Sequence, residues 1–210
     1  MIEVEGHRIF NPAYLWFLES KHRDKWQKPD QVIEALELSE GDVIADIGAG
    51  GGYFTEKFSM VVGKSGHVYA VDVQDIMISR LKERVRTNKL DNVTVIRGKF
   101  ETPMLPAKAI DIAFFSSVYK EIDGRIEYMK DMRKSLKKGG RVAILEFYKH
   151  LELAGPEFAD RMYEKQVLEE METAGFYLTQ SFGFLPKEYF FVFGIKDDGL
   201  FTRPSNLPPG

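Results

Sequence analysis

The sequence predicts an α/β fold, in which helices cover both faces of a mostly parallel sheet. Short apolar runs alternate along the chain with segments that carry apolar residues at helical spacing, and this alternation is typical of parallel βαβ units. One apolar run, residues 43–47, leads directly into a glycine-rich segment, as a strand-to-helix turn at a ligand site does. Near the end of the chain, two apolar runs at 176–182 and 189–195 predict a β-hairpin.

The first elements in chain order surround the glycine-rich segment. Pro29 suits the first turn of a helix, because that turn leaves its N–H groups unpaired, and apolar residues follow it at helical spacing. The run 43–47 predicts a buried strand. A second helix is predicted over 53–60, and the turn at 63–66, which contains two glycines, ends it.

The later elements continue the alternation. The expected strands are 68–71, 93–96, 110–115 and 141–147. Three further helices carry apolar stripes that begin at Met77, Ile126 and Val167. We expect the second of these helices to end in the run 137–140, because cations and glycines favour helix C-termini, and the third to end at Gly175.

Acidic residues stand at the ends of the first two expected strands. Asp46 belongs to the run 43–47, and Asp72 directly follows the run 68–71. A carboxylate at the end of the second strand of such a unit can accept hydrogen bonds from ribose hydroxyls. The glycines between the two strands let the backbone approach a ligand closely, because they lack Cβ. Together these features predict a ligand that contains a nucleoside.

The detailed spacing distinguishes between nucleoside ligands. A dinucleotide fingerprint that starts at Gly48 requires glycine at position 53, where this chain has Tyr53. Pyrophosphate disfavours a nearby anion, whereas the sulfonium and ammonium of S-adenosylmethionine favour one. The alternation of Asp46 with Gly48, Gly50 and Gly52 resembles motif I of the class I S-adenosylmethionine-dependent methyltransferases.

This resemblance covers about residues 29–195. The segments 28–29, 40–42, 139–141 and 174–176 are similar to the ubiquinone-biosynthesis-like and type 11 methyltransferases, whose substrates in one bacterial and archaeal branch are mostly unassigned. The resemblance implies a Rossmann-like class I methyltransferase fold. In that fold a seven-stranded, mostly parallel sheet has helices on both faces and a C-terminal antiparallel β-hairpin.

The resemblance also implies S-adenosyl-L-methionine as the cofactor and gives roles to single residues. The motif I glycines would cradle its methionine part, Asp46 would orient the loop or the ammonium, and Asp72 would accept the ribose hydroxyls. Relatives usually carry Gly-Asp where this chain has Gly98-Lys99, so Glu101 or Phe100 would face the adenine instead. The full predicted cofactor-binding set is Asp46, Gly48, Gly50, Gly52, Asp72, Val73, Lys99, Phe100, Glu101 and Ser116.

Methyl transfer from a sulfonium demands little chemistry from the protein, because the leaving group is good and neutral. Positioning the acceptor in a dry pocket contributes most, and a base is needed only where the acceptor is protonated at neutral pH. Many relatives carry histidine where this chain has Lys120, so a histidine base is not available there. The predicted catalytic residues are Tyr119, Lys120 and Tyr148, with Glu146 and His150 as further candidates, and the alternative for each is a solvated strand-end residue. The four histidines show no metal-ligand spacing, so no metal site is predicted.

Composition indicates a cytoplasmic enzyme that acts on a small molecule. The 210 residues suffice for one α/β domain, and the net charge of −3 argues against a non-specific nucleic-acid binder. No apolar run approaches the roughly 20 residues of a membrane span, and the lack of cysteine excludes disulfides and thiolate chemistry. The 16 phenylalanines favour an apolar or aromatic acceptor. We expect a monomer or homodimer without a nucleic-acid partner.

Three regions are expected along the chain. Residues 1–28 precede the cofactor fold and contain several aromatic side chains, which suggests an N-terminal helical extension or lid over the substrate pocket. Residues 29–196 would form the S-adenosylmethionine-binding methyltransferase domain. Residues 197–210 are rich in proline and glycine and would form a loose tail.

Two other functions stay open at this point. A protein that binds S-adenosylmethionine without turnover would be compatible with Lys99 and Lys120 at their unusual positions. An NAD-dependent oxidoreductase would share the fold class, but Tyr53 and the terminal hairpin count against it.

Overall fold

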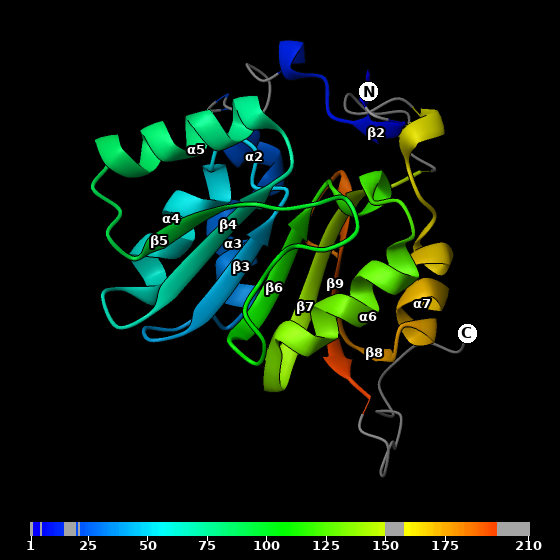
Figure 1. Ribbon diagram of the computed structural model, residues 1–210. Helices are drawn as coiled ribbons and strands as arrows, with labels where there is room; N and C mark the ends of the chain where they lie inside the picture. Colours follow the sequence, from blue (N-terminus) through cyan, green and yellow to red (C-terminus); the bar gives the residue numbers. More distant parts are fainter. Residues whose placement is uncertain (1, 5, 15–19, 21, 150–157, 197–210) are drawn as a thin grey trace.

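The computed structural model describes residues 2–4, 6–14, 20, 22–149 and 158–196, and its centre is a seven-stranded sheet (Figure 1). The strands are β3 (Val43–Ile47), β4 (His67–Asp72), β5 (Val93–Arg97), β6 (Ile110–Ser116), β7 (Leu136–Phe147), β8 (Phe176–Phe182) and β9 (Glu188–Ile195). They lie in the order β5-β4-β3-β6-β7-β9-β8. The first five pair in parallel, whereas β9 runs antiparallel to both β7 and β8. The predicted mostly parallel sheet with its C-terminal hairpin is confirmed.

Helices cover both faces of this sheet, as predicted (Figure 1). The principal helices are α3 (Pro29–Ala35), α4 (Tyr53–Val62), α5 (Asp75–Thr87), α6 (Arg125–Ser135) and α7 (Glu164–Thr173). Outside the sheet the chain forms β1 (Ile2–Val4), β2 (His7–Ile9), α2 (Arg23–Gln27) and three single turns, η1 (Pro12–Tyr14), η2 (Tyr119–Glu121) and η3 (Phe158–Asp160). None of the described helices has the length and apolar character needed to cross a membrane.

Alternate residues of the central strands point to opposite faces and build two apolar layers. On one face, Phe114 of β6 packs against Phe58 of α4, with ring centroids 5.0 Å apart. On the other face, the next residue, Phe115, belongs to the layer that includes Met129 of α6. These side chains are fully buried, so the central strands are fixed from both sides. The loops at their carboxyl ends therefore start from rigid positions.

The strand order creates a crevice between β3 and β6. After β3 the chain builds β4 and β5 on one side, and it then crosses back to place β6 on the other side of β3. The helix that follows β3 packs on one face of the sheet, and α6, which follows β6, packs on the other. The two connections diverge at this switch point, where open α/β sheets bind their ligands.

The end of α6 differs from the prediction. The helix stops at Ser135, and residues 136–140, predicted as its last turn, belong to β7 instead. Leu136 already pairs with β6, and Lys137 forms an ion pair with Asp111 at 2.6 Å. Lys137, which suggested a helix C-terminus, thus lies in a strand and pairs with Asp111 of β6. Asp111 is distant in the sequence, so the residues around Lys137 do not reveal this pairing.

The N-terminal region is mixed rather than purely helical. β1 and β2 pair antiparallel in a small separate sheet, and α2 follows before α3. The segment 150–157 and the predicted tail 197–210 lie outside the described residues.

Candidate active site

A cavity of about 620 Å³ lies at the crevice between β3 and β6, and its size is typical of small-ligand sites. Residues 46–51 at the end of β3 and 71–74 at the end of β4 form one side, and residues 116–118 at the end of β6 form another. Residues 9–11 of the N-terminal region also line it. The cavity therefore combines the carboxyl ends of the central strands with a segment from the start of the chain.

Gly48 and Gly50 shape the loop after β3. Their φ angles are +67° and +56°, in the left-handed region that favours glycine. A Cβ on Gly48 would come within 2.3 Å of Val118 Cγ2, whereas one on Gly50 would meet no atom within 4 Å. Gly48 thus permits close approach of the β3 and β6 loops. Gly50, which lines the cavity, leaves open space for a ligand.

Asp72 ends β4 and holds two N–H groups of the surrounding loops. Its Oδ2 accepts from the Gly50 N–H and its Oδ1 from the Gln74 N–H, both at 2.9 Å. Burial raises the pKa of this carboxyl, against the effect of these hydrogen bonds. Each carboxylate oxygen has a second lone pair, so Asp72 can still accept from a ligand hydroxyl.

Asp46, in β3 just before the glycine loop, is bonded to α4. Its Oδ2 accepts from the Thr55 hydroxyl of α4 at 2.6 Å, and burial raises its pKa to about 6. The N–H groups of Gly48 and Ala49 both donate to the Val71 carbonyl, at 2.8 and 3.0 Å. With two carboxyls nearby and these N–H groups already used, the loop is poorly suited to pyrophosphate.

The loops after β4 and β5 place three of the predicted residues at the cavity. Val73, Lys99 and Phe100 line the cavity, and the Phe100 ring stacks on His7 with centroids 3.7 Å apart. Glu101 instead lines a smaller neighbouring cavity of about 250 Å³. The structure therefore brings Phe100, but not Glu101, to the wall of the main cavity.

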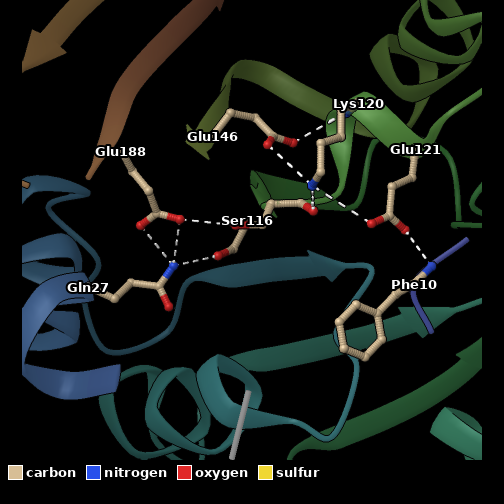
Figure 2. A network of polar contacts seen from close by, with 8 residues as sticks. Phe10, Gln27, Ser116, Lys120, Glu121, Glu146 and Glu188 are labelled. Carbon is tan, nitrogen blue, oxygen red and sulfur yellow. Dashed lines mark hydrogen bonds and ion pairs between the residues drawn. The ribbon is translucent and has the colours of Figure 1, made fainter. Parts of the chain in front are cut away.

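Lys120 is a buried cation held by two carboxylates (Figure 2). Its Nζ lies 3.4 Å from Glu146 Oε2 and 3.7 Å from Glu121 Oε1, and it donates to the Ser117 carbonyl. Burial lowers the pKa of this amine, but Glu146 and Glu121 outweigh burial, so the pKa is raised. Lys120 therefore stays protonated at neutral pH.

Glu121 connects the N-terminal region to η2 (Figure 2). Its Oε2 accepts from the Phe10 N–H at 3.1 Å, and burial raises its pKa to about 7. The Phe10 carbonyl accepts from Gln74 Nε2 at 3.3 Å, and His7 Nδ1 lies 2.7 Å from Asp123 Oδ2. Residues 7–10 are thus tied to the loops after β4 and β6.

A second buried polar group joins α2 to the sheet (Figure 2). Gln27 Nε2 donates to both oxygens of Glu188, at 3.1 and 3.0 Å, and lies 3.0 Å from Ser116 Oγ. Ser117 Oγ donates to Glu188 at 3.0 Å, and Arg23 Nε donates to Gln27. Burial raises the pKa of Glu188 to about 7. This group fixes the hydroxyl of Ser116, which lines the cavity.

Aromatic rings line the part of the cavity near α2 and β7. Trp26 of α2 lies against Phe147, the last residue of β7, with ring centroids 5.4 Å apart. Tyr53 and Phe54 at the start of α4 also line the cavity, and the Arg23 guanidinium lies 4.1 Å from the centre of the Tyr53 ring. A flat apolar ligand would find aromatic surface here.

Several predicted residues lie away from the cavity. The Tyr119 hydroxyl donates to Glu170 of α7 at 3.1 Å, and burial raises the pKa of Tyr119. Tyr148 does not line the cavity either, although Lys120 does. Gly52 caps α4, where a Cβ would press on α5 side chains at 3.0 Å. His150 lies outside the described residues.

The sequence patterns assign no role to Gln27, Glu188 or Glu121. Their partners are far away along the chain, and Gln27 and Glu188 are separated by 161 positions. One signal was present for Glu188, which stands as a single acid directly before the apolar run 189–193. A charge at the start of a buried strand requires a polar partner. The sequence alone does not show which residue that partner is.

The residues present fit S-adenosylmethionine, the cofactor that the resemblance implies. Open space at Gly50, the acceptor capacity of Asp72 and the acidic surroundings match a nucleoside ligand that carries positive charge. Among the described residues, no cluster of three or more His, Asp or Glu side chains could hold a metal ion. The site therefore suits a cationic nucleoside cofactor.

Comparisons with known proteins agree with this geometry. A family model described as a methyltransferase domain matches residues 38–184. The ubiquinone/menaquinone biosynthesis C-methyltransferase of Vibrio parahaemolyticus is 32% identical over 118 residues, which is 56% of this chain and 46% of that protein. The protein-L-isoaspartate O-methyltransferase of Methanothermobacter thermautotrophicus is 28% identical over 86% of this chain and 76% of that protein. The chain thus spans about half the length of the first of these relatives.

Solved structures show the same fold. A SAM-dependent methyltransferase from Aquifex aeolicus superposes with a TM-score of 0.85 at 25% identity, over 89% of this chain and 100% of that chain. A 1,6-didemethyltoxoflavin-N1-methyltransferase from Burkholderia thailandensis, solved with S-adenosylhomocysteine, gives a TM-score of 0.62 at 19% identity, over 90% and 92% of the two chains. At 19% identity, the second structure supports only a shared fold.

Proposed function

The chain belongs to the methyltransferase domain family, whose cofactor is S-adenosylmethionine, and we propose that it methylates a small apolar or aromatic acceptor. The observation that carries this proposal is the division of one cavity into two parts. Glycines and carboxyls line the part at β3 and β4, which we call the cofactor half. Aromatic rings and the Ser116 and Lys120 side chains line the part at α2, β6 and β7, which we call the acceptor half.

The proposed reaction is an in-line displacement that depends on positioning. Bound S-adenosylmethionine supplies a methyl group on a sulfonium, which leaves as a neutral thioether. Asp72 would hold the ribose and Gly50 would leave room for the cofactor, while the Asp46 and Asp72 carboxylates would favour a cationic ligand in this part of the cavity. Trp26 and Phe147 would orient the acceptor and keep water away from the reacting atoms.

Two observations support an aromatic acceptor. The tilted pair of Trp26 and Phe147 offers ring surface, and Ser116, fixed by Gln27, offers a hydroxyl beside it. In addition, curated relatives are named for C-methylation in ubiquinone and menaquinone biosynthesis, and quinones are ring compounds.

Transfer from methyl-labelled S-adenosylmethionine tests the proposal. Hydroquinones, phenols, indoles and aliphatic amines are offered in parallel to the wild-type chain, to Trp26→Ala and to Tyr163→Ala. We expect aromatic compounds to be methylated, and Trp26→Ala to lower kcat/KM for them at least tenfold without changing cofactor affinity. Tyr163 is an exposed aromatic outside the cavity, so its replacement should have no effect. A preference for aliphatic amines would contradict the aromatic acceptor.

A further inference from the structure

We propose that Glu121 is the catalytic base, which accepts the acceptor's proton through Oε1 while Oε2 is held by the N-terminal segment. The inference rests on the proposed function and adds a catalytic residue to it. Glu121 lines the cavity from η2, next to Lys120 and the β6 loop. Its carboxyl is largely enclosed, with 13% of the side chain exposed.

The other ionisable groups of the cavity are committed elsewhere. Lys120 cannot accept a proton, because Glu146 and Glu121 hold it in the charged form. Asp72 uses one oxygen for each of two loop N–H groups. Asp46 is bonded to Thr55 of α4, and Asp160 has an interaction of its own. Asp72 and Asp46 therefore already hold groups of the protein.

Glu121 differs from Asp72, because one of its oxygens accepts no hydrogen bond from a described residue and only faces Lys120 in an ion pair. Oε2 accepts from the Phe10 N–H at 3.1 Å, which fixes the orientation of the carboxylate. Oε1 lies 3.7 Å from Lys120 Nζ, beyond hydrogen-bond distance, and no described residue donates to it. A proton can therefore bind to Oε1 without breaking a hydrogen bond of the protein.

The surroundings adjust this carboxyl for proton transfer near neutral pH. Burial raises its pKa to about 7, Glu146 of β7 and Asp72 of β4 act in the same direction, and Lys120 of η2 opposes them. The N-terminal segment contributes the Phe10 N–H, which favours the charged form. A base whose pKa lies near the working pH is the most effective one.

The proposed step balances in atoms and in charge. The acceptor's X–H bond breaks and its proton moves to Glu121 Oε1, while the X–C bond forms and the C–S bond of the sulfonium breaks. One cation and one carboxylate thereby become a neutral thioether and a neutral carboxylic acid. Lys120 keeps Glu146 at 3.4 Å and the Ser117 carbonyl, so no buried charge is left without a partner.

Acceptors of graded acidity test the inference. 4-Nitrophenol is largely ionised at pH 8 and needs no base, whereas hydroquinone needs one. With hydroquinone we expect Glu121→Gln to lower single-turnover transfer at least a hundredfold and to abolish the rise in rate with pH around 7. With 4-nitrophenol the loss should stay below fivefold. Glu121→Asp should restore part of the hydroquinone rate. Equal losses with both phenols, or a retained pH profile in Glu121→Gln, would overturn the proposal.

A measurement without turnover observes the carboxyl directly. In protein labelled with ¹³C at glutamate side-chain carboxyls, two resonances should titrate near pH 7, because Glu188 also has a pKa of about 7, and only one of them should be missing from Glu121→Gln. S-adenosylmethionine should lower the midpoint of that resonance more than S-adenosylhomocysteine does, because only the former is a cation. A Glu121 resonance that stays ionised down to pH 5 would exclude it as the base.

Failure of the base and failure of the proposed function give different results. If the wild-type chain binds S-adenosylmethionine and methylates both phenols while Glu121→Gln does the same, only the base is refuted. If the wild-type chain does not bind the cofactor, the proposed function fails first. Asp123→Asn serves as the matched control, because it weakens the His7 contact of the same N-terminal segment by removing the carboxylate charge. It should keep the pH profile.

Discussion

The two halves of the cavity are built in different ways. The cofactor half relies on backbone groups, since Asp72 accepts from two loop N–H groups and Gly48 allows two loops to meet. The acceptor half relies on buried side chains, which form the contacts of Lys120 with Glu146 and of Gln27 with Glu188. Backbone sites tolerate changes of most side chains, whereas buried ionic groups depend on each partner. Mutations should therefore act differently in the two halves.

The largest effect on stability is expected from Glu188→Ala in the acceptor half. The change removes two of the three acceptors of Gln27 Nε2, leaving Ser116 Oγ, and it removes the carboxylate whose charge favours buried Arg23. We expect the free energy of unfolding to fall by about 3–5 kcal/mol, measured by urea denaturation. Glu188→Gln keeps an acceptor and should cost less. Equal small losses for both variants would show that this buried group is not important for stability.

The pH dependence of stability is the next largest effect. The pKa of Glu188 is about 7 in the folded chain, against 4.5 as the ordinary value, so the folded state binds more protons between these values. Its contribution is fully present below about pH 4.5 and is lost as the pH rises through 7, by about 3 kcal/mol. Urea unfolding at pH 5.5 and 7.5 should show about 2 kcal/mol of this loss in the wild type and a smaller one in Glu188→Gln. A parallel pH response of both proteins would contradict the assignment.

In the cofactor half, comparing Gly48→Ala with Gly139→Ala should distinguish the cost of a steric clash from the cost of backbone strain. Gly139 has a similar positive φ of +79° but open space around it, so Gly139→Ala carries the same kind of strain without a clash. We expect Gly48→Ala to lose about 1–3 kcal/mol more unfolding free energy than this control. Its S-adenosylmethionine affinity should fall more than tenfold, and that of the control should not change. Calorimetric titration provides the comparison.

The smallest effect concerns a hydroxyl near the acceptor half. Tyr189 Oη is buried and has no hydrogen-bond partner among the described residues, whereas the Tyr119 hydroxyl donates to Glu170. Tyr119→Phe should cost about 1 kcal/mol, because it removes a bond, while Tyr189→Phe should be neutral or stabilising by up to about 1 kcal/mol. Thermal unfolding of both variants measures the difference. A loss in Tyr189→Phe would mean that its hydroxyl has a partner.

The same difference explains how far the sequence could predict this protein. The cofactor half follows from local order, since Gly48, Gly50 and Asp72 occur in one strand-helix-strand unit. Even there, the sequence did not show that Gly52 faces α5 rather than the cavity. The acceptor half depends on which distant residues meet. No short spacing brings Gln27 to Glu188, so only the three-dimensional structure identifies that pair.

The end of α6 gives the same lesson at the level of secondary structure. Lys137 and the two glycines after it have the composition of a helix C-terminus. They extend a strand because Asp111 on β6 pairs with Lys137. A tertiary partner thus overrides a local preference.

The central claim is that the cofactor half binds S-adenosylmethionine, and calorimetric titration of the wild-type chain tests it most directly. S-adenosylmethionine, S-adenosylhomocysteine and NAD are titrated in parallel, together with Asp72→Asn as a variant. The account predicts micromolar binding of the first two ligands, none of NAD, and at least tenfold weaker binding by the variant, because the loop N–H groups and the ribose both depend on Asp72. Binding of NAD alone, or of none of the three, would contradict it.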